Sequence, residues 1–155
     1  LNKGIKTSLR QTDNYDSNRD GMDIAFCAYD AGNFTLRFSG ANRPLWIIRK
    51  NATQVEEIKP TKRTIAGFTN ADQEFDQHWL SLEPGDCFYI FSDGYTDLFG
   101  GALLKKLTTG RLKELLLSIK EKSMKEQEKA LVDFAMEWQG NAQQIDDILI
   151  IGVRV

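Results

Sequence analysis

The chain has 155 residues, a formal net charge of −2 and a hydrophobic content of 41%. Such a composition is ordinary for one globular domain over residues 1–155, and a chain of this length buries about 68–70% of its unfolded surface without disulfides. The near-neutral charge gives no electrostatic reason to expect a nucleic-acid partner.

Two further features concern the cellular location. No stretch approaches the ~20 apolar residues of a membrane-spanning helix, and the first residues lack a signal-peptide core. Cys27 and Cys87 both fall in apolar strand patterns, which favours reduced thiols and a cytoplasmic location. The chain does not begin with methionine. We therefore expect a piece of a longer protein. A membrane tether elsewhere in that protein is compatible with this expectation.

The first part of the chain predicts a helix followed by antiparallel strands. Leu1, Ile5 and Leu9 recur every four residues, which is typical of the last turns of a helix. The polar residues 12–21 indicate a loop. Alternating apolar residues on both sides of a short Gly/Asn loop predict a hairpin. The predicted strands of this mostly antiparallel meander cover residues 22–29, 34–39, 45–48, 55–58, 74–82 and 87–93.

The last third of the chain predicts two helices and a final strand. Ser123 followed by Glu126 is a capping-box pattern for the second helix, and Gly140 is well placed to end it. Helices inserted between strands of a meander indicate an α+β fold with a helical layer packed on a sheet. The apolar stripes that define the helices are Leu112, Leu115, Leu116 and Ile119 in the first, and Leu131, Phe134, Ala135 and Trp138 in the second.

Two acidic signatures stand at the ends of apolar runs. The strand pattern that starts at Cys87 ends in Asp93-Gly94, and the pair Asp146-Asp147 opens the last predicted strand. A carboxylate at the end of a buried strand is costly unless a cation meets it, and adjacent carboxylates repel each other. Oxygen ligands without a nearby His or Cys select a hard ion such as Mg²⁺ or Mn²⁺.

Each signature also has an ordinary structural interpretation. Asp93-Gly94 is a common turn sequence, and Asp146-Asp147 would serve as an acidic cap on a strand edge. His78, the one histidine of the chain, falls in a predicted strand where a surface or rim position is favoured over a catalytic one. Gly100-Gly101 predicts a plain loop. The sequence displays no Ser-His-Asp arrangement, no cysteine nucleophile and no Gly-rich phosphate loop.

Five short motifs follow one another along the chain. They are Asp20-Gly21-Met22-Asp23-Ile24-Ala25, Ser39-Gly40-Ala41-Asn42-Arg43-Pro44-Leu45, Leu82-Glu83-Pro84-Gly85-Asp86, Phe91-Ser92-Asp93-Gly94-Tyr95-Thr96-Asp97 and Asp146-Asp147-Ile148. In this order the motifs resemble the bacterial sporulation-type (SpoIIE-like) serine phosphatases of the metal-dependent PP2C superfamily. The resemblance covers nearly the whole chain, and it is strongest for members found at the C terminus of large sensor proteins.

The resemblance implies a PP2C-like β-sandwich flanked by helices, with a dinuclear Mn²⁺ or Mg²⁺ site in the intact domain. By motif, Asp93 and Asp146 would be metal ligands, with Asp147 as a neighbouring candidate and with Gly94 and Asn42 beside the site. In this family a metal-bound water attacks the phosphorus, so no protein nucleophile is required. Ala41 stands where other branches place an aspartate for an additional metal, and we expect no such ion here.

The chain also departs from the family pattern. Members carry an acidic strand residue and an Asp-Gly-His-Gly-like segment upstream of the helix with which this chain starts. We therefore expect an N-terminally incomplete domain that can lack its metal ions and is weak or inactive alone. Its open sheet edge or apolar face would be covered by self-association into a homo-oligomer.

The activity implied is that of a bacterial signalling enzyme that removes phosphate from a phosphoserine or phosphothreonine of a regulatory protein. A candidate substrate is an anti-sigma-factor antagonist, with control by upstream sensor domains of the same polypeptide, as in two-component regulation. The alternative is a degenerate phosphatase-like module that binds a partner or transmits a signal without turnover. A phosphoacceptor receiver domain also uses clustered aspartates and Mg²⁺, but its acidic pair belongs near the start of a parallel α/β fold.

Overall fold

The computed structural model describes residues 1–11 and 19–155. Most of the loop predicted at residues 12–21 thus lies outside the described residues. The chain forms two compact units, each built from two separate segments. Unit 1 comprises Leu1–Leu45 and Ile58–Leu82, and unit 2 comprises Trp46–Glu57 and Glu83–Val155. None of the described helices is both long enough and apolar enough to cross a bilayer.

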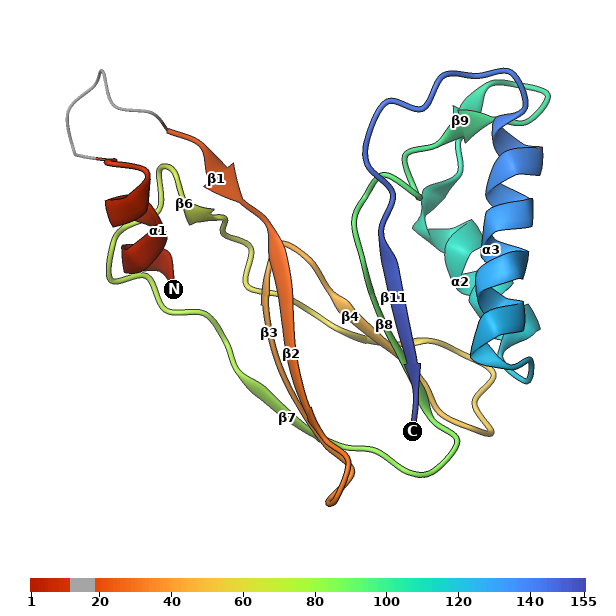
Figure 1. Cartoon of the computed structure of the whole chain (residues 1–155), viewed down its shortest axis with the longest axis horizontal. Helices are drawn as coiled ribbons and strands as arrows, with labels where there is room; N and C mark the ends of the chain where they lie inside the picture. Colours follow the sequence, from red (N-terminus) through yellow and green to blue (C-terminus); the bar gives the residue numbers. More distant parts are fainter. Residues whose placement is uncertain (12–18) are drawn as a thin grey trace. The chain divides into compact units, whose positions relative to one another are not determined.

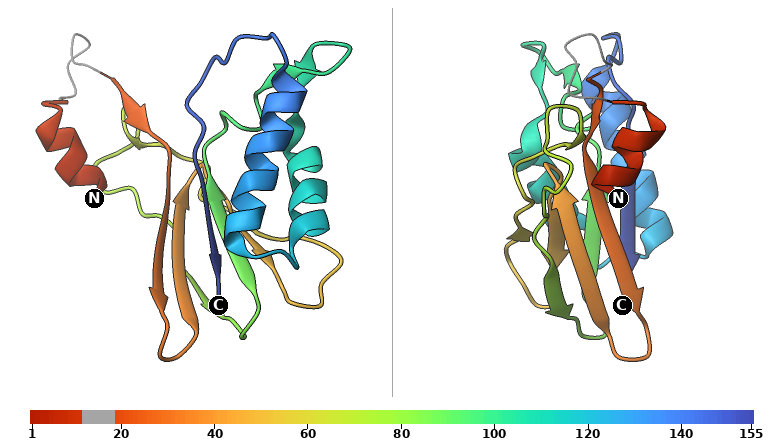
Figure 2. Two further views of the ribbon diagram at one scale, coloured as in Figure 1. Left: turned by 45° about the vertical axis from the view of Figure 1, so that its right-hand side comes forward. Right: turned by 90° about the vertical axis from the view of Figure 1, so that its left-hand side faces the viewer.

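Unit 1 contains a three-stranded antiparallel sheet in the order β2-β3-β7. β2 and β3 form the long hairpin visible in Figures 1 and 2, with Ile24 opposite Ala41 at one end and Asp30 opposite Thr35 at the other. The predicted hairpin is therefore confirmed. The elements of unit 1 are α1 (Asn2–Ser8), β1 (Gly21–Met22), β2 (Ile24–Asp30), β3 (Thr35–Ala41), β6 (Ile65–Ala66) and β7 (His78–Ser81).

The strand predicted at residues 74–82 is shorter in the structure, since β7 begins only at His78. The Thr61 hydroxyl explains the late start. It accepts a hydrogen bond from the Asp76 backbone N–H at 2.9 Å and donates one to Asp76 Oδ2 at 2.9 Å. At Asp76 the chain is therefore hydrogen-bonded to the Thr61 side chain and not to a neighbouring strand.

Helix α1 is fixed to the loop after β6 by polar side chains. The buried Asn2 accepts a hydrogen bond from Ala66 N–H at 2.7 Å and donates one to the Asn70 carbonyl at 2.6 Å. Lys6 Nζ donates to the Gly67 carbonyl at 3.0 Å. Ala66 adopts a left-handed conformation with φ of 63°, which is uncommon for a residue with a side chain. Asn2 therefore holds a strained turn in place.

Unit 2 contains a four-stranded sheet in the order β11-β8-β4-β5, in which β8 pairs antiparallel with both β11 and β4. The predicted strand at 55–58 is confirmed as β5, and the two predicted helices are confirmed as α2 and α3. The elements are β4 (Leu45–Ile48), β5 (Glu56–Ile58), β8 (Cys87–Phe91), β9 (Phe99–Gly100), β10 (Lys105–Lys106), α2 (Thr108–Ile119), α3 (Met124–Gln139) and β11 (Ile150–Arg154).

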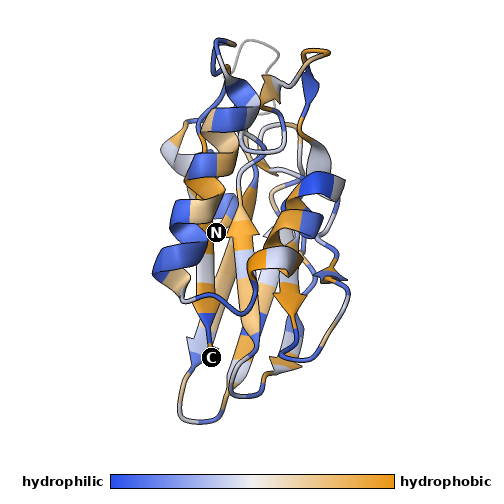
Figure 3. Ribbon diagram, turned by 90° about the vertical axis from the view of Figure 1, so that its right-hand side faces the viewer, coloured by the Kyte–Doolittle hydropathy of each residue, from blue (hydrophilic) through white to orange (hydrophobic). Residues whose placement is uncertain are grey.

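The core of unit 2 lies between its sheet and the apolar faces of α2 and α3. In Figure 3 hydrophobic residues colour the strands behind the helices, and both helices carry hydrophobic as well as hydrophilic residues. Ser123 and Glu126 form the predicted capping box at the start of α3, and Gly140 ends the helix with a φ of 53°. The buried members of this core include Trp46, Tyr89, Phe91, Leu98, Leu107, Leu112, Leu116 and Leu131.

The interpretation of Gly100-Gly101 as part of a plain loop holds for Gly101, which lies in a turn, but is wrong for Gly100, which belongs to β9 and the small antiparallel hairpin of β9 and β10. This hairpin is fixed to the end of α3 through Trp138. The Trp138 carbonyl accepts a hydrogen bond from Gly101 N–H at 2.8 Å, and Trp138 Nε1 donates to the Leu98 carbonyl at 3.0 Å. A Cβ at Gly100 would lie 1.8 Å from the Trp138 carbonyl oxygen. The absence of a side chain there is a packing requirement.

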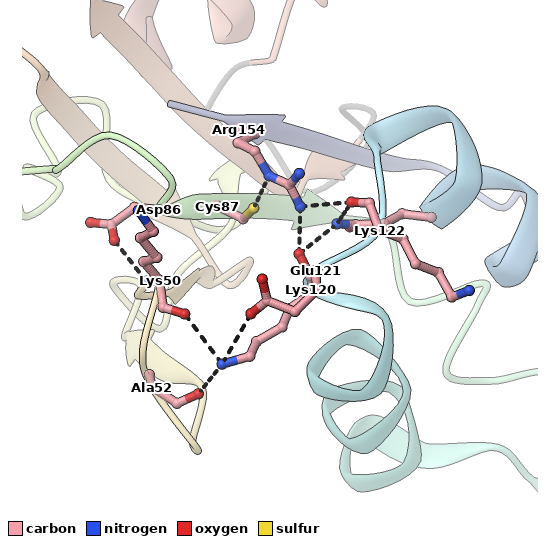
Figure 4. Close-up of polar contacts among 9 residues, drawn as sticks. Lys50, Ala52, Asp86, Cys87, Lys120, Glu121, Lys122 and Arg154 are labelled. Carbon is pink, nitrogen blue, oxygen red and sulfur yellow. Dashed lines mark hydrogen bonds and ion pairs between the residues drawn. The ribbon is translucent and has the colours of Figure 1, made fainter.

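The joint between α2 and α3 is fixed by two cations, Arg154 from β11 and Lys120 of the joint itself, as Figure 4 shows. The Arg154 guanidinium at the end of β11 donates to the carbonyls of Lys120 and Lys122, and Arg154 Nε donates to Cys87 Sγ at 3.4 Å. Lys120 Nζ donates to the Ala52 carbonyl at 2.8 Å. Positive side chains are favourable at a helix C terminus, where carbonyl groups lack intrahelical partners. Arg154 therefore ties the last strand to the helical pair.

Candidate metal centre

The loop after β8 places Asp93 at one end of the unit 2 sheet. Two bonds to its carbonyl close a tight turn: Asp97 N–H donates to the Asp93 oxygen at 2.8 Å, and Thr96 Oγ1 donates to it at 3.0 Å. The ring of Tyr95 is buried, and its hydroxyl donates to the Leu131 carbonyl of α3 at 2.8 Å. Burial raises the pKa of Tyr95 above its ordinary value. The half-buried Asp93 thus sits on a loop that is anchored in the core.

The pair Asp146-Asp147 lies in the segment that leads into β11. The structure corrects the expectation that this pair opens the strand itself, because β11 begins at Ile150. Ser92 explains this difference. Its hydroxyl accepts a hydrogen bond from Leu149 N–H at 3.0 Å and donates one to the Asp147 carbonyl at 2.8 Å, while Ser92 N–H donates to the Leu149 carbonyl at 3.0 Å. The two predicted acidic segments are therefore bonded to each other.

Gly94 allows these two segments to approach. A Cβ at this position would lie 2.2 Å from the Asp147 carbonyl oxygen and 3.3 Å from that of Asp146. The first distance is far below van der Waals contact, so a residue with a side chain does not fit without moving the backbone. Gly94, predicted to lie beside the site, is in contact with the acidic pair. The structure thus brings Asp93, Gly94, Asp146 and Asp147 to one end of the unit 2 sheet, which we call the acidic rim.

The charges of Asp146 and Asp147 face solvent. Among the described residues, no Lys or Arg forms an ion pair with either side chain. The contacts that they do make are local: Asp147 N–H donates to Asp146 Oδ1 at 2.8 Å, and Gln144 Nε2 donates to the Asp146 carbonyl at 2.8 Å. Two adjacent carboxylates without a cation are stabilised by any positive ion that binds there.

The chemistry of the acidic rim suits a hard cation, but the rim does not form a complete set of ligands. Carboxylate oxygens are the donors that Mg²⁺ and Mn²⁺ prefer. Within residues 1–11 and 19–155, however, no group of three or more His, Cys, Asp or Glu side chains is arranged to hold a metal ion. The remaining ligands of an ion at the rim would have to be water, carbonyl or hydroxyl oxygens, or groups beyond these residues.

Asn42, the other residue predicted to lie beside the site, belongs to unit 1. Its side-chain amide donates to Asp23 Oδ1 at 2.9 Å, and Arg43 Nη2 lies 3.4 Å from Asp23 Oδ2. Asn42 has a φ of 57°, which this residue type tolerates better than most. Its place next to the metal site stays a prediction.

His78 is half-buried in β7, where its ring stacks on Phe38 with centroids 5.9 Å apart. Its Nε2 is buried and has no hydrogen-bond partner within the described part of the chain. The expectation of a surface or rim position is thus only partly met. The stacking supports the non-catalytic interpretation, since it makes His78 part of the packing of unit 1.

Sequence reasoning missed the role of Asp86, which it named as the last residue of the motif Leu82-Glu83-Pro84-Gly85-Asp86. Asp86 is only 2% exposed. Its carboxylate accepts hydrogen bonds from Arg49 Nη1 at 2.9 Å, Lys50 N–H at 2.9 Å and Glu83 N–H at 3.0 Å. Burial alone would raise the pKa of Asp86, but these bonds outweigh burial and hold the pKa below its usual range. This carboxylate already has its cation, so its role is structural.

Solved structures of phosphatase domains share this fold. The SiaA-PP2C domain of Pseudomonas aeruginosa superimposes with a TM-score of 0.84 at 26% identity, covering 99% of this chain and 57% of its own. The phosphatase domain of SpoIIE from Bacillus subtilis gives 0.64 at 17% identity, covering 99% and 64%. The RsbU and RsbW domains of Rv1364c from Mycobacterium tuberculosis give 0.72 at 13%, covering 98% and 39%. Among the curated proteins, no match was found.

These likenesses confirm the predicted α+β fold of the PP2C type. The chain spans less than two thirds of the SiaA and SpoIIE domains that it matches. A family model described as Stage II sporulation protein E (SpoIIE) matches residues 2–155, and the chain belongs to the SpoIIE family.

Proposed function

We propose that this chain is part of a metal-dependent protein serine/threonine phosphatase of a bacterial signalling protein. The observation that carries the proposal is the acidic rim, where Gly94 and Ser92 hold the backbone of the pair Asp146-Asp147 against the loop that carries Asp93. The two acidic segments are 53 positions apart in sequence, from Asp93 to Asp146. Nothing in the local sequence brings them together. Folding of unit 2 creates their proximity.

Asp93 and Asp146 are the residues that would hold Mn²⁺ or Mg²⁺, with Asp147 as a neighbouring ligand. The donor chemistry of the acidic rim supports this assignment, as does the B. subtilis SpoIIE phosphatase domain, which was also studied after presoaking with Mn. When bound, the ion supplies Lewis acidity and an activated water for phosphoester hydrolysis. The chain's own contribution is to fix the spacing of the carboxylates through backbone contacts. No side-chain nucleophile is required.

The substrate that we propose is a phosphoserine or phosphothreonine on a regulatory protein, with an anti-sigma-factor antagonist as the first candidate. The family match supports a phosphatase, and the M. tuberculosis structure contains an RsbU and an RsbW domain in one chain. We place the protein in the cytoplasm, under the control of sensor domains in the same polypeptide. The 155 residues alone would be weak or inactive, because the acidic rim offers too few ligands.

The test compares two variants of the longest polypeptide encoded in frame around these residues. Wild type is expected to hydrolyse p-nitrophenyl phosphate when Mn²⁺ is added, and Asp93→Asn is expected to lower that rate about 100-fold. The matched control is Asp133→Asn on the surface of α3, where Asp133 only pairs with Lys129. Equal rates for wild type and Asp93→Asn would remove the enzyme proposal.

A second measurement reports metal binding without activity. Mn²⁺ that binds only the folded chain stabilises it by RT ln(1 + [Mn²⁺]/Kd), and so raises its thermal midpoint. We expect a rise for wild type and for Asp133→Asn, and a smaller one for Asp93→Asn. A midpoint that Mn²⁺ leaves unchanged in all three, for the longer polypeptide, would contradict the assignment of the rim as a metal site.

One observation favours a second function, a degenerate phosphatase-like module that binds a partner without turnover. The described residues lack a group of three metal-binding side chains. In that case the longer polypeptide would show no Mn²⁺-dependent hydrolysis. It would still bind the phosphorylated anti-sigma-factor antagonist, with the same affinity in wild type and Asp93→Asn.

A further inference from the structure

The turn that carries Asp93 is fixed to α3 at two points. The Tyr95 hydroxyl donates to the Leu131 carbonyl at 2.8 Å, and Trp138 Nε1 donates to the Leu98 carbonyl at 3.0 Å. Leu131 and Trp138 are seven positions apart in α3, so both lie on the same side of the helix, about two turns apart. Figure 1 shows β9, which follows Leu98, beside the C-terminal end of α3. The helix therefore holds both ends of the loop that runs from Tyr95 to Leu98.

The bond of Tyr95 is not one that the helix needs. Leu131 lies inside α3, where its carbonyl already accepts the bond of the helix itself. A carbonyl oxygen has two lone pairs, and the Tyr95 hydroxyl uses the second one. Tyr95 is only 2% exposed, and a buried hydroxyl without a partner would be unfavourable. The bond therefore fixes Tyr95, and with it the loop, to a helix that does not depend on it.

Tyr95 lies inside the turn that positions Asp93. Asp97 N–H and Thr96 Oγ1 both donate to the Asp93 carbonyl, so these bonds close the backbone around Tyr95. On the other side of the turn, the Thr96 carbonyl accepts a hydrogen bond from Thr108 N–H at 2.9 Å, at the start of α2. Because the turn is short and closed, movement of Tyr95 away from α3 would move the backbone of Asp93 as well.

The second acidic segment depends on the same helix through the chain itself. Helix α3 ends at Gln139, and residues 140–145 lead from there to Asp146. Gln139 Nε2 donates to the Ala142 carbonyl at 2.9 Å, which fixes the start of this connection. Both halves of the acidic rim are thus attached to α3, Asp93 by hydrogen bonds and Asp146 by covalent continuity. Their spacing depends on how firmly the turn of Asp93 is held to the helix.

We propose that Tyr95 is a positioning residue of the acidic rim, whose hydroxyl holds the backbone of Asp93 at the place where a divalent cation binds most tightly. The proposal rests on the proposed function, since it takes Asp93 as a metal ligand. Tyr95 acts through the backbone, because its buried hydroxyl is bonded to α3. Residues that orient a metal ligand in this indirect way change metal affinity by about 10–100-fold when they are removed. A purely structural hydroxyl would contribute to stability alone.

Tyr89 supplies a matched control on the same helix. It is 1% exposed, and its hydroxyl donates to Gln127 Oε1 of α3 at 2.8 Å, about one turn before Leu131. Tyr89 lies in the middle of β8 and not in the turn of Asp93. Tyr89→Phe leaves the buried Gln127 Oε1 without its donor, so it should cost at least as much stability as Tyr95→Phe. The two changes therefore separate loss of stability from displacement of Asp93.

Amide hydrogen exchange of the 155-residue chain, measured by NMR without metal, tests the backbone contact. Tyr95→Phe is expected to lower the thermal midpoint by about 2–4 °C, and Tyr89→Phe by at least as much. In Tyr95→Phe the Asp97 amide, which closes the turn on Asp93, should exchange about 10-fold faster than in wild type. In Tyr89→Phe its rate should change by less than about 2-fold. Equal acceleration in the two variants, or none in Tyr95→Phe, would overturn the proposal.

Isothermal titration calorimetry with Mn²⁺ tests the consequence in the longest polypeptide encoded in frame around these residues. Tyr95→Phe is expected to raise the Kd for Mn²⁺ about 10-fold, and Tyr89→Phe to leave it within about 2-fold of wild type. Equal Mn²⁺ binding by wild type and Tyr95→Phe would overturn this proposal and leave the proposed function intact. A wild type that does not bind Mn²⁺ would remove both.

Discussion

The carboxylates at the two ends of the unit 2 sheet differ in burial and in the partners that they bind. At one end, Asp86 is buried and accepts hydrogen bonds from Arg49 and two backbone amides. At the other end, Asp146 and Asp147 face solvent without an ion pair to a described Lys or Arg. A buried carboxylate that has its own cation stabilises the fold, whereas carboxylates gathered by the backbone and left exposed are available to an added ion. The difference separates a structural acid from candidate ligands more clearly than sequence position does.

The largest effect should come from removing the structural acid. Asp86→Ala removes the acceptor of Arg49 Nη1 and of the Lys50 and Glu83 backbone N–H groups, which we expect to lower the free energy of unfolding by about 3 kcal/mol. Asp146→Ala, at the acidic rim, should change it by less than about 0.5 kcal/mol. Urea denaturation of the 155-residue chain measures both. Similar losses for the two variants would mean that the ends of the sheet do not differ in this way.

The next effect concerns the backbone contact at the acidic rim. Gly94→Ala places a Cβ against the Asp147 carbonyl and should cost about 2 kcal/mol of stability, with weaker Mn²⁺ binding because the two acidic segments separate. Gly110→Ala in α2 is the matched control. A Cβ there meets only Thr108 Oγ1 at 3.9 Å, so this change should stabilise the helix by about 0.5–1 kcal/mol. A stable Gly94→Ala variant with normal Mn²⁺ binding would show that the close approach is not needed.

A smaller effect is expected from the hydroxyl that joins the two acidic segments. Ser92→Ala removes the bonds to the Asp147 carbonyl and Leu149 N–H, which should cost about 1 kcal/mol. The Leu149 amide should then exchange faster with solvent, while the amides of Ile151 and Val153, which face β8, keep their protection. Unchanged exchange at Leu149 would argue that the segments are held by other contacts.

The smallest effect is the pH dependence of the structural acid. Because the pKa of Asp86 is lower in the folded chain than in the unfolded chain, the unfolded state binds more protons as pH falls. The stabilisation by Asp86 is therefore fully present above the unfolded pKa of about 3.9 and is lost as pH falls through the folded pKa. Urea midpoints between pH 6 and pH 2, with Asp86→Asn as the reference, measure this part. Parallel curves for the two proteins would contradict it.

Features with a local signature were predictable from sequence. The hairpin of β2 and β3 follows from alternation around a Gly/Asn loop, and α3 follows from its capping box and its apolar stripe. The pairing of Asp93 with Asp146 at one site came from the order of family motifs. The structure supports that expectation at the level of the backbone, through Ser92 and Gly94.

Features that depend on distant partners were not predictable. Asp86 looks like any turn residue until Arg49, 37 positions earlier, is placed beside it. The β9–β10 hairpin depends on Trp138, whose carbonyl accepts a hydrogen bond from Gly101 N–H. The start of β11 was placed too early because the Ser92 hydroxyl, and not a strand, receives Leu149 N–H. In each case a tertiary hydrogen bond overrides the local pattern.

The length of strand β11 fixes the spacing between the contacts at its two ends. Asp147 precedes it and rests on Gly94, while Arg154 ends it and holds the α2–α3 joint. A slip of two residues against β8 would move both groups by about 7 Å, and a slip of one would reverse every side chain. Neither error can occur at one end alone. The contacts of Arg154 at the far end of β11 therefore fix the register of the strand, and with it the positions of the acidic residues that precede the strand.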